Sequence, residues 1–332
     1  MSAIEFRNRY FNALLDLAWR QWTNLGVSGH MANSNSRYVY DPEMLLIFSA
    51  WFCRYEPRLY DLIIDWLRNN GAFINISRLK SLMKKVPWVD PASLGFMFRY
   101  AGESGDRRWK KLADELIPSE SVSPQTLFLT IDGEANDFLK NKDENALQYG
   151  YLRSPYLASK KTTQFSSAAK GSFLLQLRGA FGLSARAEAI LALLNKDVCK
   201  IQDIADISCF SWKSIQDVMA ELCASSLVAS QGGVKRGRYY FIKNPQAFLA
   251  VWGKENADFP DWKSVFNALA VVWQTVSNPK LAKLSEATFH SEVKRAFEDQ
   301  IADSLLNAGI SSLKFFSPED ISALPEMIAD LA

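Results

Sequence analysis

Apolar residues recur at helical spacing along most of the chain. The first stretch shows the pattern with residues three or four positions apart, namely Phe11, Leu14, Leu15, Ala18, Trp19 and Trp22. Similar spacing follows Asp41-Pro42 and Asp90-Pro91, where an Asp before a Pro is typical of a helix start. It returns after Pro57 and again after Pro245. The pattern therefore predicts a mainly α-helical protein.

The pattern changes in the central part of the chain. Residues 185–194 (ARAEAILALL), 201–208 (IQDIADIS) and 211–226 (SWKSIQDVMAELCASS) each carry one apolar stripe, which predicts three short helices. They are followed by an apolar run, a glycine-rich tip and an aromatic run, which predicts a β-hairpin. Just upstream, residues 173–177 (FLLQL) fit either a buried strand or the start of the first helix.

This order of elements resembles the winged helix-turn-helix superfamily of bacterial transcription regulators, in the manner of the MarR and ArsR groups. The resemblance covers residues 184–243. It implies that the third helix enters the major groove of double-stranded DNA and that the hairpin forms a wing beside it. It also implies a homodimer, because one recognition helix reads few base pairs. The function expected from the resemblance is DNA-binding transcriptional regulation.

The resemblance points to particular DNA-contacting residues. Ser211 is expected to cap the third helix, so that the amide end of this helix faces a phosphate. Trp212, Lys213, Ser214 and Gln216 lie outside the apolar stripe of that helix. Lys213 is suited to guanine O6 and N7, and Gln216 to adenine N6 and N7.

Basic residues extend the expected interface beyond the third helix. The hairpin tip carries Lys235, Arg236 and Arg238, which are suited to phosphates or to the minor groove. Residues 153–182 contain five basic residues and no acid, and Lys160 and Lys161 from this stretch complete the predicted interface. This distribution predicts a basic linker over residues 151–181.

Acidic residues on the same module favour an alternative. Asp203 and Asp206 lie on the second predicted helix and Asp217 on the third, and each repels a phosphate. A winged helix can also hold a protein. The alternative hypothesis is therefore a non-enzymatic protein–protein interaction module of a defence or toxin–antitoxin system.

Motifs for catalysis are sparse. The chain has no GxxxxGK[ST], GxGxxG or GxSxG motif. Its four cysteines form no CxxC pair and it has only two histidines, so no zinc cluster is expected. Asp132 and Glu134 follow a predicted strand at 126–131 (TLFLTI), which suggests a metal-dependent nuclease or nucleotidyltransferase as a third hypothesis. A polar turn around Gly133 is the favoured explanation, because no basic or phosphate-binding motif accompanies the two acids. We therefore expect no enzyme activity, no catalytic or metal site and no cofactor.

These observations predict the following organisation. Residues 1–150 form a helical domain, in which 58–131 resembles a second helix-turn-helix with a short strand at 72–74, a helix capped by Ser77 and a basic run at 107–111. Next come the linker at 151–181, the winged helix-turn-helix at 182–243 and a helical accessory domain at 244–332. The longest apolar run, at 44–52, is too short to cross a bilayer, so a cytoplasmic protein without membrane contact is expected.

Overall fold

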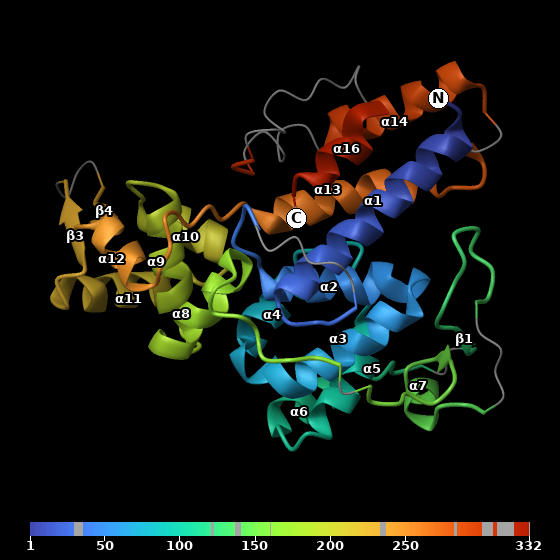
Figure 1. Ribbon diagram of the computed structural model, residues 1–332, viewed down its shortest axis with the longest axis horizontal. Coiled ribbons are helices and arrows are strands. Elements are labelled where there is room, and N and C mark those ends of the chain that lie inside the picture. The colour runs from blue at the N-terminus through green and yellow to red at the C-terminus, as the bar shows by residue number, and fades with distance from the viewer. Residues whose placement is uncertain are drawn as a thin grey trace.

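The computed structural model confirms a mainly helical chain, with 59% of it in helices (Figure 1). The structure describes residues 1–332 apart from 30–35, 121–122, 137–140, 160, 233–236, 282–283, 301–307, 311–321 and 332. At residues 297, 299 and 300 only the backbone is described.

The described residues of the first part of the chain form six helices, and the second of them is buried at the centre. They are α1 (Ala3–Asn24), α2 (Pro42–Phe52), α3 (Pro57–Asn70), α4 (Ile76–Met83), α5 (Pro91–Gly102) and α6 (Arg107–Glu115). Every residue of α2 except Trp51 is buried, because α4, α5 and a later helix all pack on it. The predicted Asp-Pro helix starts are confirmed, since Asp41 accepts the Met44 amide and Asp90 accepts the Ser93 amide.

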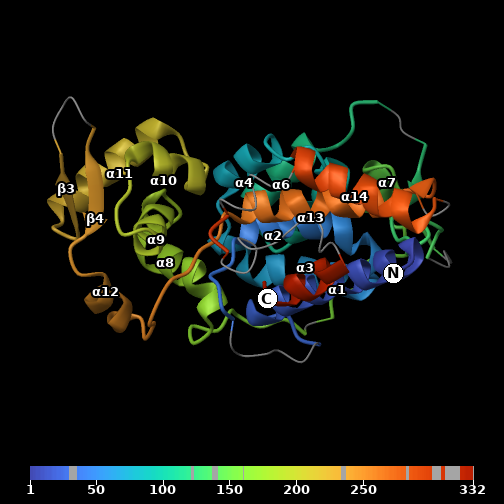
Figure 2. The same cartoon turned by 90° about the horizontal axis from the view of Figure 1, so that it is seen from above.

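Helices from the end of the chain share this core. They are α13 (Trp262–Val276), α14 (Glu286–Gln300) and α16 (Leu324–Ala329). The rings of Phe48 and Phe266 are 4.7 Å apart, and Tyr10 Oη donates to the Leu269 carbonyl at 2.9 Å. In Figures 1 and 2, α16 lies along α1, close to the C-terminus. The C-terminal helices are thus packed on the N-terminal ones, and the expected domain boundaries stay a prediction.

Short elements lie between the helices of the body and lead on to the central part of the chain. They are the 3-10 helices η1 (Cys53–Tyr55), η2 (Gly71–Phe73) and η3 (Lys170–Ser172), the strands β1 (Gln125–Thr126) and β2 (Tyr151–Leu152), and the helices α7 (Glu144–Gln148) and α8 (Phe173–Phe181). The two strands pair in parallel, Gln125 with Tyr151. Neither prediction for residues 173–177 is confirmed as made: they are helical and not a strand, but they form the separate helix α8, which ends before the helix expected at 185–194 begins.

Three local predictions are wrong. The strand expected at 126–131 is only two residues long, because the Leu129 amide donates to Arg54 and residues 130–133 form a turn. The strand expected at 72–74 is the 3-10 helix η2. The cap of α4 is Asn75, which accepts the Arg78 amide, so that Ser77 lies inside the helix.

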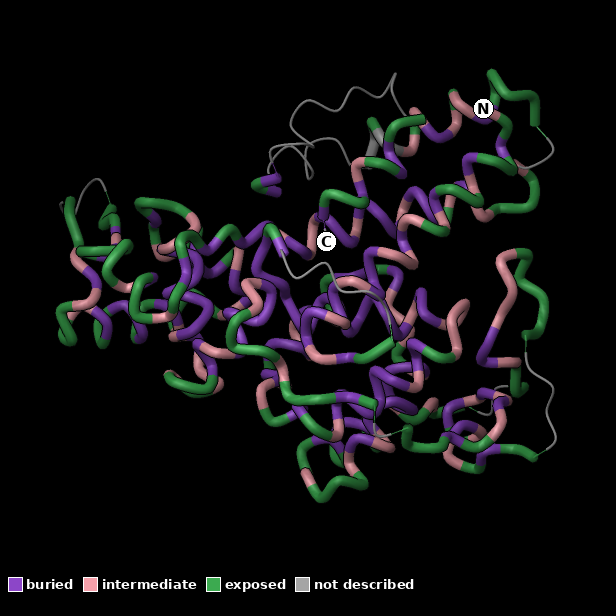
Figure 3. The backbone as a smooth tube through the Cα atoms, in the orientation of Figure 1, coloured by how far each residue is buried: buried purple, intermediate pink, exposed green. Residues whose placement is uncertain are grey.

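Three helices and a hairpin form one end of the molecule (Figures 1 and 2). They are α9 (Arg186–Asn195), α10 (Ile201–Ser208), α11 (Trp212–Ala224), β3 (Val228–Gln231) and β4 (Tyr239–Ile242), after which comes α12 (Pro245–Val251). The strands are antiparallel, and Val228 lies opposite Ile242. On the other side of β4, Cys199 and Tyr240 exchange backbone hydrogen bonds of 3.0 and 2.8 Å. Figure 3 shows buried segments in the helical body and in α9, whereas the outer part of the hairpin is exposed.

Candidate nucleic-acid interface

A cavity of about 490 Å³ lies where α10, α11 and the hairpin meet. Its walls are formed by Lys200, Ile201, Gln202, Trp212, Gln216, Gly237, Arg238 and Tyr240. Three residues predicted from the sequence, Trp212, Gln216 and Arg238, therefore come together. Trp212 and Gln216 are on the first turns of α11, and Arg238 directly precedes β4.

The buried stripe of α11 determines which side chains reach this cavity. Ile215, Val218, Met219 and Leu222 are buried, so Trp212 and Gln216 point outward. Ser211 caps the helix as predicted, with its Oγ accepting the Ser214 amide at 3.1 Å. The Ser211 and Ser214 hydroxyls also contact each other at 2.8 Å, and neither residue lines the cavity. The indole of Trp212 is unusual, because 48% of this large apolar residue is exposed.

Lys213 is exposed but lies outside the cavity. Its Nζ is 2.7 Å from Asp217 Oδ1, one turn further along α11. Asp217, whose charge would repel a phosphate, therefore pairs with Lys213, the residue expected to contact guanine. The acids of α10 also have partners, since Asp203 accepts the Lys200 amide and Asp206 accepts Gln202 Nε2.

Lys200 is a site residue that the sequence pattern did not reveal. It precedes α10, and its ammonium lies 5.1 Å from the centre of the Tyr239 ring. The backbone pairing of Cys199 with Tyr240 brings it to the hairpin. That pairing joins residues about forty positions apart, which local spacing does not indicate.

Two glycines close the base of the hairpin tip. Gly232 has φ +115 and Gly237 has φ +78, conformations that favour glycine. A Cβ on Gly232 would lie 2.6 Å from the Gly237 carbonyl oxygen, so the two strands approach closely there. Lys235, Arg236 and Lys160 of the predicted interface lie outside the described residues.

Three of the five basic residues in the expected linker form ion pairs, which lowers the positive charge available to a ligand. Arg153 pairs with Asp61 at 2.6 Å, and Arg178 is fully buried against Glu43 and Glu188. Lys170 pairs with Asp258 at 2.9 Å. The remaining described base, Lys161, is exposed but does not line the cavity. Its carbonyl instead accepts the Ser28 amide, just beyond the end of α1.

The acids considered for catalysis lie on an exposed turn. Asp132 pairs with Arg7 at 2.9 Å, and the Gly133 amide donates to the Thr130 carbonyl. Within the described part of the chain, no group of three or more His, Cys, Asp or Glu residues is placed to share a metal ion. The Cys199 thiol is poorly suited to nucleophilic chemistry, because burial raises its pKa to about 11.

Comparison with known proteins identifies no relative of the chain. No protein-family model, curated protein or solved structure matches the chain. None of the described helices is both long and apolar enough to span a membrane.

Proposed function

We propose that the chain binds double-stranded DNA through α10, α11 and the hairpin, as a winged helix-turn-helix regulator of transcription. The observation that carries this proposal is the convergence of Gln216, Arg238 and Lys200 on one open cavity. The order of three helices and an antiparallel hairpin supports it, because that is the order of a winged helix.

The side chains suggest how each part contacts DNA. The exposed start of α11 enters the major groove, where the Gln216 amide pairs with an adenine edge. Arg238 and Lys200 flank the groove and neutralise phosphates on either side. Trp212 is too large for a single base edge, so its half-exposed ring packs on the sugar–phosphate wall. The chain acts as a homodimer, since one such helix reads only a few base pairs.

The test is a titration of the full chain with labelled duplex DNA from upstream of its own gene, followed by fluorescence anisotropy. Gln216→Ala combined with Arg238→Ala is expected to weaken binding by at least about tenfold, as loss of one adenine contact and one phosphate contact requires. The matched control, Gln274→Ala with Lys280→Ala, removes one glutamine amide and one positive charge from an exposed surface elsewhere. Equal affinity of the site variant and the wild type, with both folded by circular dichroism, would overturn the proposal.

A second candidate function, the non-enzymatic interaction module, is favoured by an apolar groove. This groove of about 360 Å³ is formed by Leu193, Leu194, Asp197, Val198, Gln231, Phe241, Ile242 and Pro245. Val198 is 52% exposed there and lies beside the half-buried Leu194 and Phe241, so the groove offers a continuous apolar surface for a protein to cover. Co-purification of a stoichiometric protein partner, together with no affinity for any duplex, would favour this candidate over DNA binding.

A further inference from the structure

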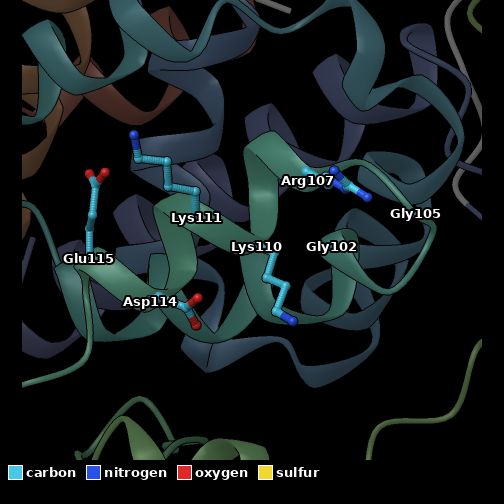
Figure 4. A pocket seen from close by; sticks show the side chains of 7 residues that line it. All are labelled: Gly102, Gly105, Arg107, Lys110, Lys111, Asp114 and Glu115. Atoms are coloured by element: carbon cyan, nitrogen blue, oxygen red, sulfur yellow. The ribbon is translucent and has the colours of Figure 1, made fainter.

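Helix α6 carries three basic residues around a larger cavity; in Figure 4, Arg107 and Lys110 lie on the side of Gly102 and Gly105, whereas Lys111 points to the side of Glu115. The cavity has a volume of about 710 Å³, and its walls are Gly102, Gly105, Arg107, Lys110, Lys111, Asp114 and Glu115. Trp109, Leu112 and Ala113 are buried, so the opposite face of the helix points to solvent. This burial directs Arg107, Lys110 and Lys111 outward.

The acids near α6 already have basic partners. Asp114 pairs with Arg99 at 3.0 Å and Glu115 pairs with Lys80. Two further ion pairs in the neighbourhood join Asp106 to Arg108 and Glu103 to Arg68. These four pairs are neutral.

Arg107, Lys110 and Lys111 make no ion pair with any described carboxylate. The surface therefore carries an excess of three positive charges. At the adjacent end of α4, which the Lys80–Glu115 pair joins to α6, Lys84 and Lys85 are exposed as well. Such a cluster attracts a polyanion.

Gly105 leaves one position of the turn before α6 without a side chain, and Gly102 lets α5 and α6 approach closely. Gly105 has φ +99, and no atom lies within 4 Å of the position of its missing Cβ. At Gly102 a Cβ would lie 2.9 Å from the Lys110 backbone nitrogen, so α5 and α6 are in close contact there. A ligand can thus approach the backbone at Gly105 without meeting a side chain at that position.

The cavity lining indicates the chemical class of the ligand. No apolar residue lines it, whereas a protein partner usually buries an apolar core. A single-stranded nucleic acid stacks its bases on exposed aromatic rings, but Trp109 is only 1% exposed. The phosphate backbone of a duplex requires neither an apolar surface nor an exposed aromatic ring, and flexible Lys and Arg side chains bind it.

We infer that Arg107, Lys110 and Lys111 form a second contact surface for the phosphate backbone of duplex DNA. In Figures 1 and 2, α6 lies on the helical body, away from α11 and the hairpin. The inference rests on the proposed function in that the ligand is the same duplex, but it uses different residues. These contacts add affinity without sequence preference.

The test compares Lys110→Gln/Lys111→Gln with a control that removes two equal charges elsewhere, Lys263→Gln/Lys280→Gln. Binding of the full chain to a duplex several helical turns long is measured by anisotropy over a series of salt concentrations. Two lost phosphate contacts should lower the slope of log K against log salt by about 1.8, because each contact contributes about 0.9. The control should keep the wild-type slope, and thermal melting should show both variants folded.

Gln216→Ala/Arg238→Ala, measured in parallel, separates the two proposals. If only the α6 variant lowers the slope, the second surface stands and the proposed α11 site falls. If only the α11 variant weakens binding, the inference about α6 is overturned and the proposed function stands. A wild-type chain that binds no duplex, or that binds poly-glutamate through Lys110 and Lys111 but not DNA, overturns the inference as well.

Discussion

Arg178 and Glu43, which are 135 residues apart in the sequence, form a bidentate ion pair in the core. Arg178 Nη1 lies 2.7 Å from Glu43 Oε1, and Nη2 lies 2.8 Å from Oε2. Arg178 also contacts Glu188 at 2.6 Å, while Arg78 bridges Glu43 and Asp41. This buried network joins α2 and α4 of the helical body to α8 and α9. It thereby holds α9, the first helix of the proposed DNA-binding end, against the helical body.

Replacement of Arg178 by Met should strongly destabilise the protein. It leaves Glu43 and Glu188 short of a counter-charge in the core, which costs about 3–5 kcal/mol of unfolding free energy. The measurement is urea denaturation followed by circular dichroism. Arg186→Met is the control, because its pair with Glu221 is solvent-exposed and contributes at most about 1 kcal/mol. A loss below that value for Arg178→Met would contradict a structural role of the network.

Gly71 is required by packing and not by backbone conformation. It follows α3, where a glycine is typical of a left-handed helix end, but its φ is −59°. A Cβ at this position would instead lie 2.6 Å from Trp109 Nε1 in the core. Gly71→Ala should therefore lower the free energy of unfolding by about 1–3 kcal/mol through overpacking.

Gly179 in α8 is the matched control for this substitution. The nearest atom to its Cβ position is on the Phe73 ring at 3.5 Å, which is ordinary contact. Gly179→Ala should raise the free energy of unfolding by about 0.5–1 kcal/mol, because alanine loses less backbone entropy in a helix. In urea denaturation, the changes in unfolding free energy of the two variants should have opposite signs. A stabilised Gly71→Ala protein would show that the Trp109 ring moves aside for the added methyl group at little cost.

Local signals in the sequence predict most of the helices but few of the tertiary contacts. Caps such as Asp41, Asp90 and Ser211 accept an amide within one helical turn, so they can be predicted from the local sequence. The two-residue pairing of Gln125 with Tyr151 depends on a partner elsewhere in the chain, and the longer strand predicted there is wrong.

The candidate site shows the same division. The apolar stripe of α11 predicts that Trp212 and Gln216 face outward. Composition alone could not show that Arg178 is buried beside two acids, because the pairing arises only in the folded chain. Lys200 was missed for the same reason, since the Cys199–Tyr240 pairing brings it to the hairpin.

Tyr149 should make the protein less stable at alkaline pH. Its hydroxyl donates to the Ala113 carbonyl at 3.1 Å, and burial raises the pKa of Tyr149 to about 12. The unfolded chain, with a tyrosine pKa near about 10, loses this proton first, so the stability contributed by Tyr149 is present below about pH 10 and declines above it.

The measurement compares Tyr149→Phe with the wild type. Between about pH 9 and about pH 11, the wild type should lose about 1 kcal/mol more unfolding free energy than the variant, because Phe does not titrate. Urea denaturation at both pH values gives this difference directly. An identical pH dependence of the two proteins would mean that the Tyr149 hydroxyl ionises as readily in the folded chain as in the unfolded one.

Asp217→Asn distinguishes the two candidate functions at the start of α11. Asp217 holds Lys213 at 2.7 Å and places a negative charge on the face that carries Gln216. If α11 lies against DNA, the variant removes a repulsion and releases Lys213, so affinity for the duplex should rise by about threefold to tenfold at low salt. Glu255→Gln, which removes an equal exposed charge away from α11, should leave affinity unchanged. If the acid instead contacts a protein partner, Asp217→Asn weakens that complex and does not improve DNA binding in anisotropy titrations.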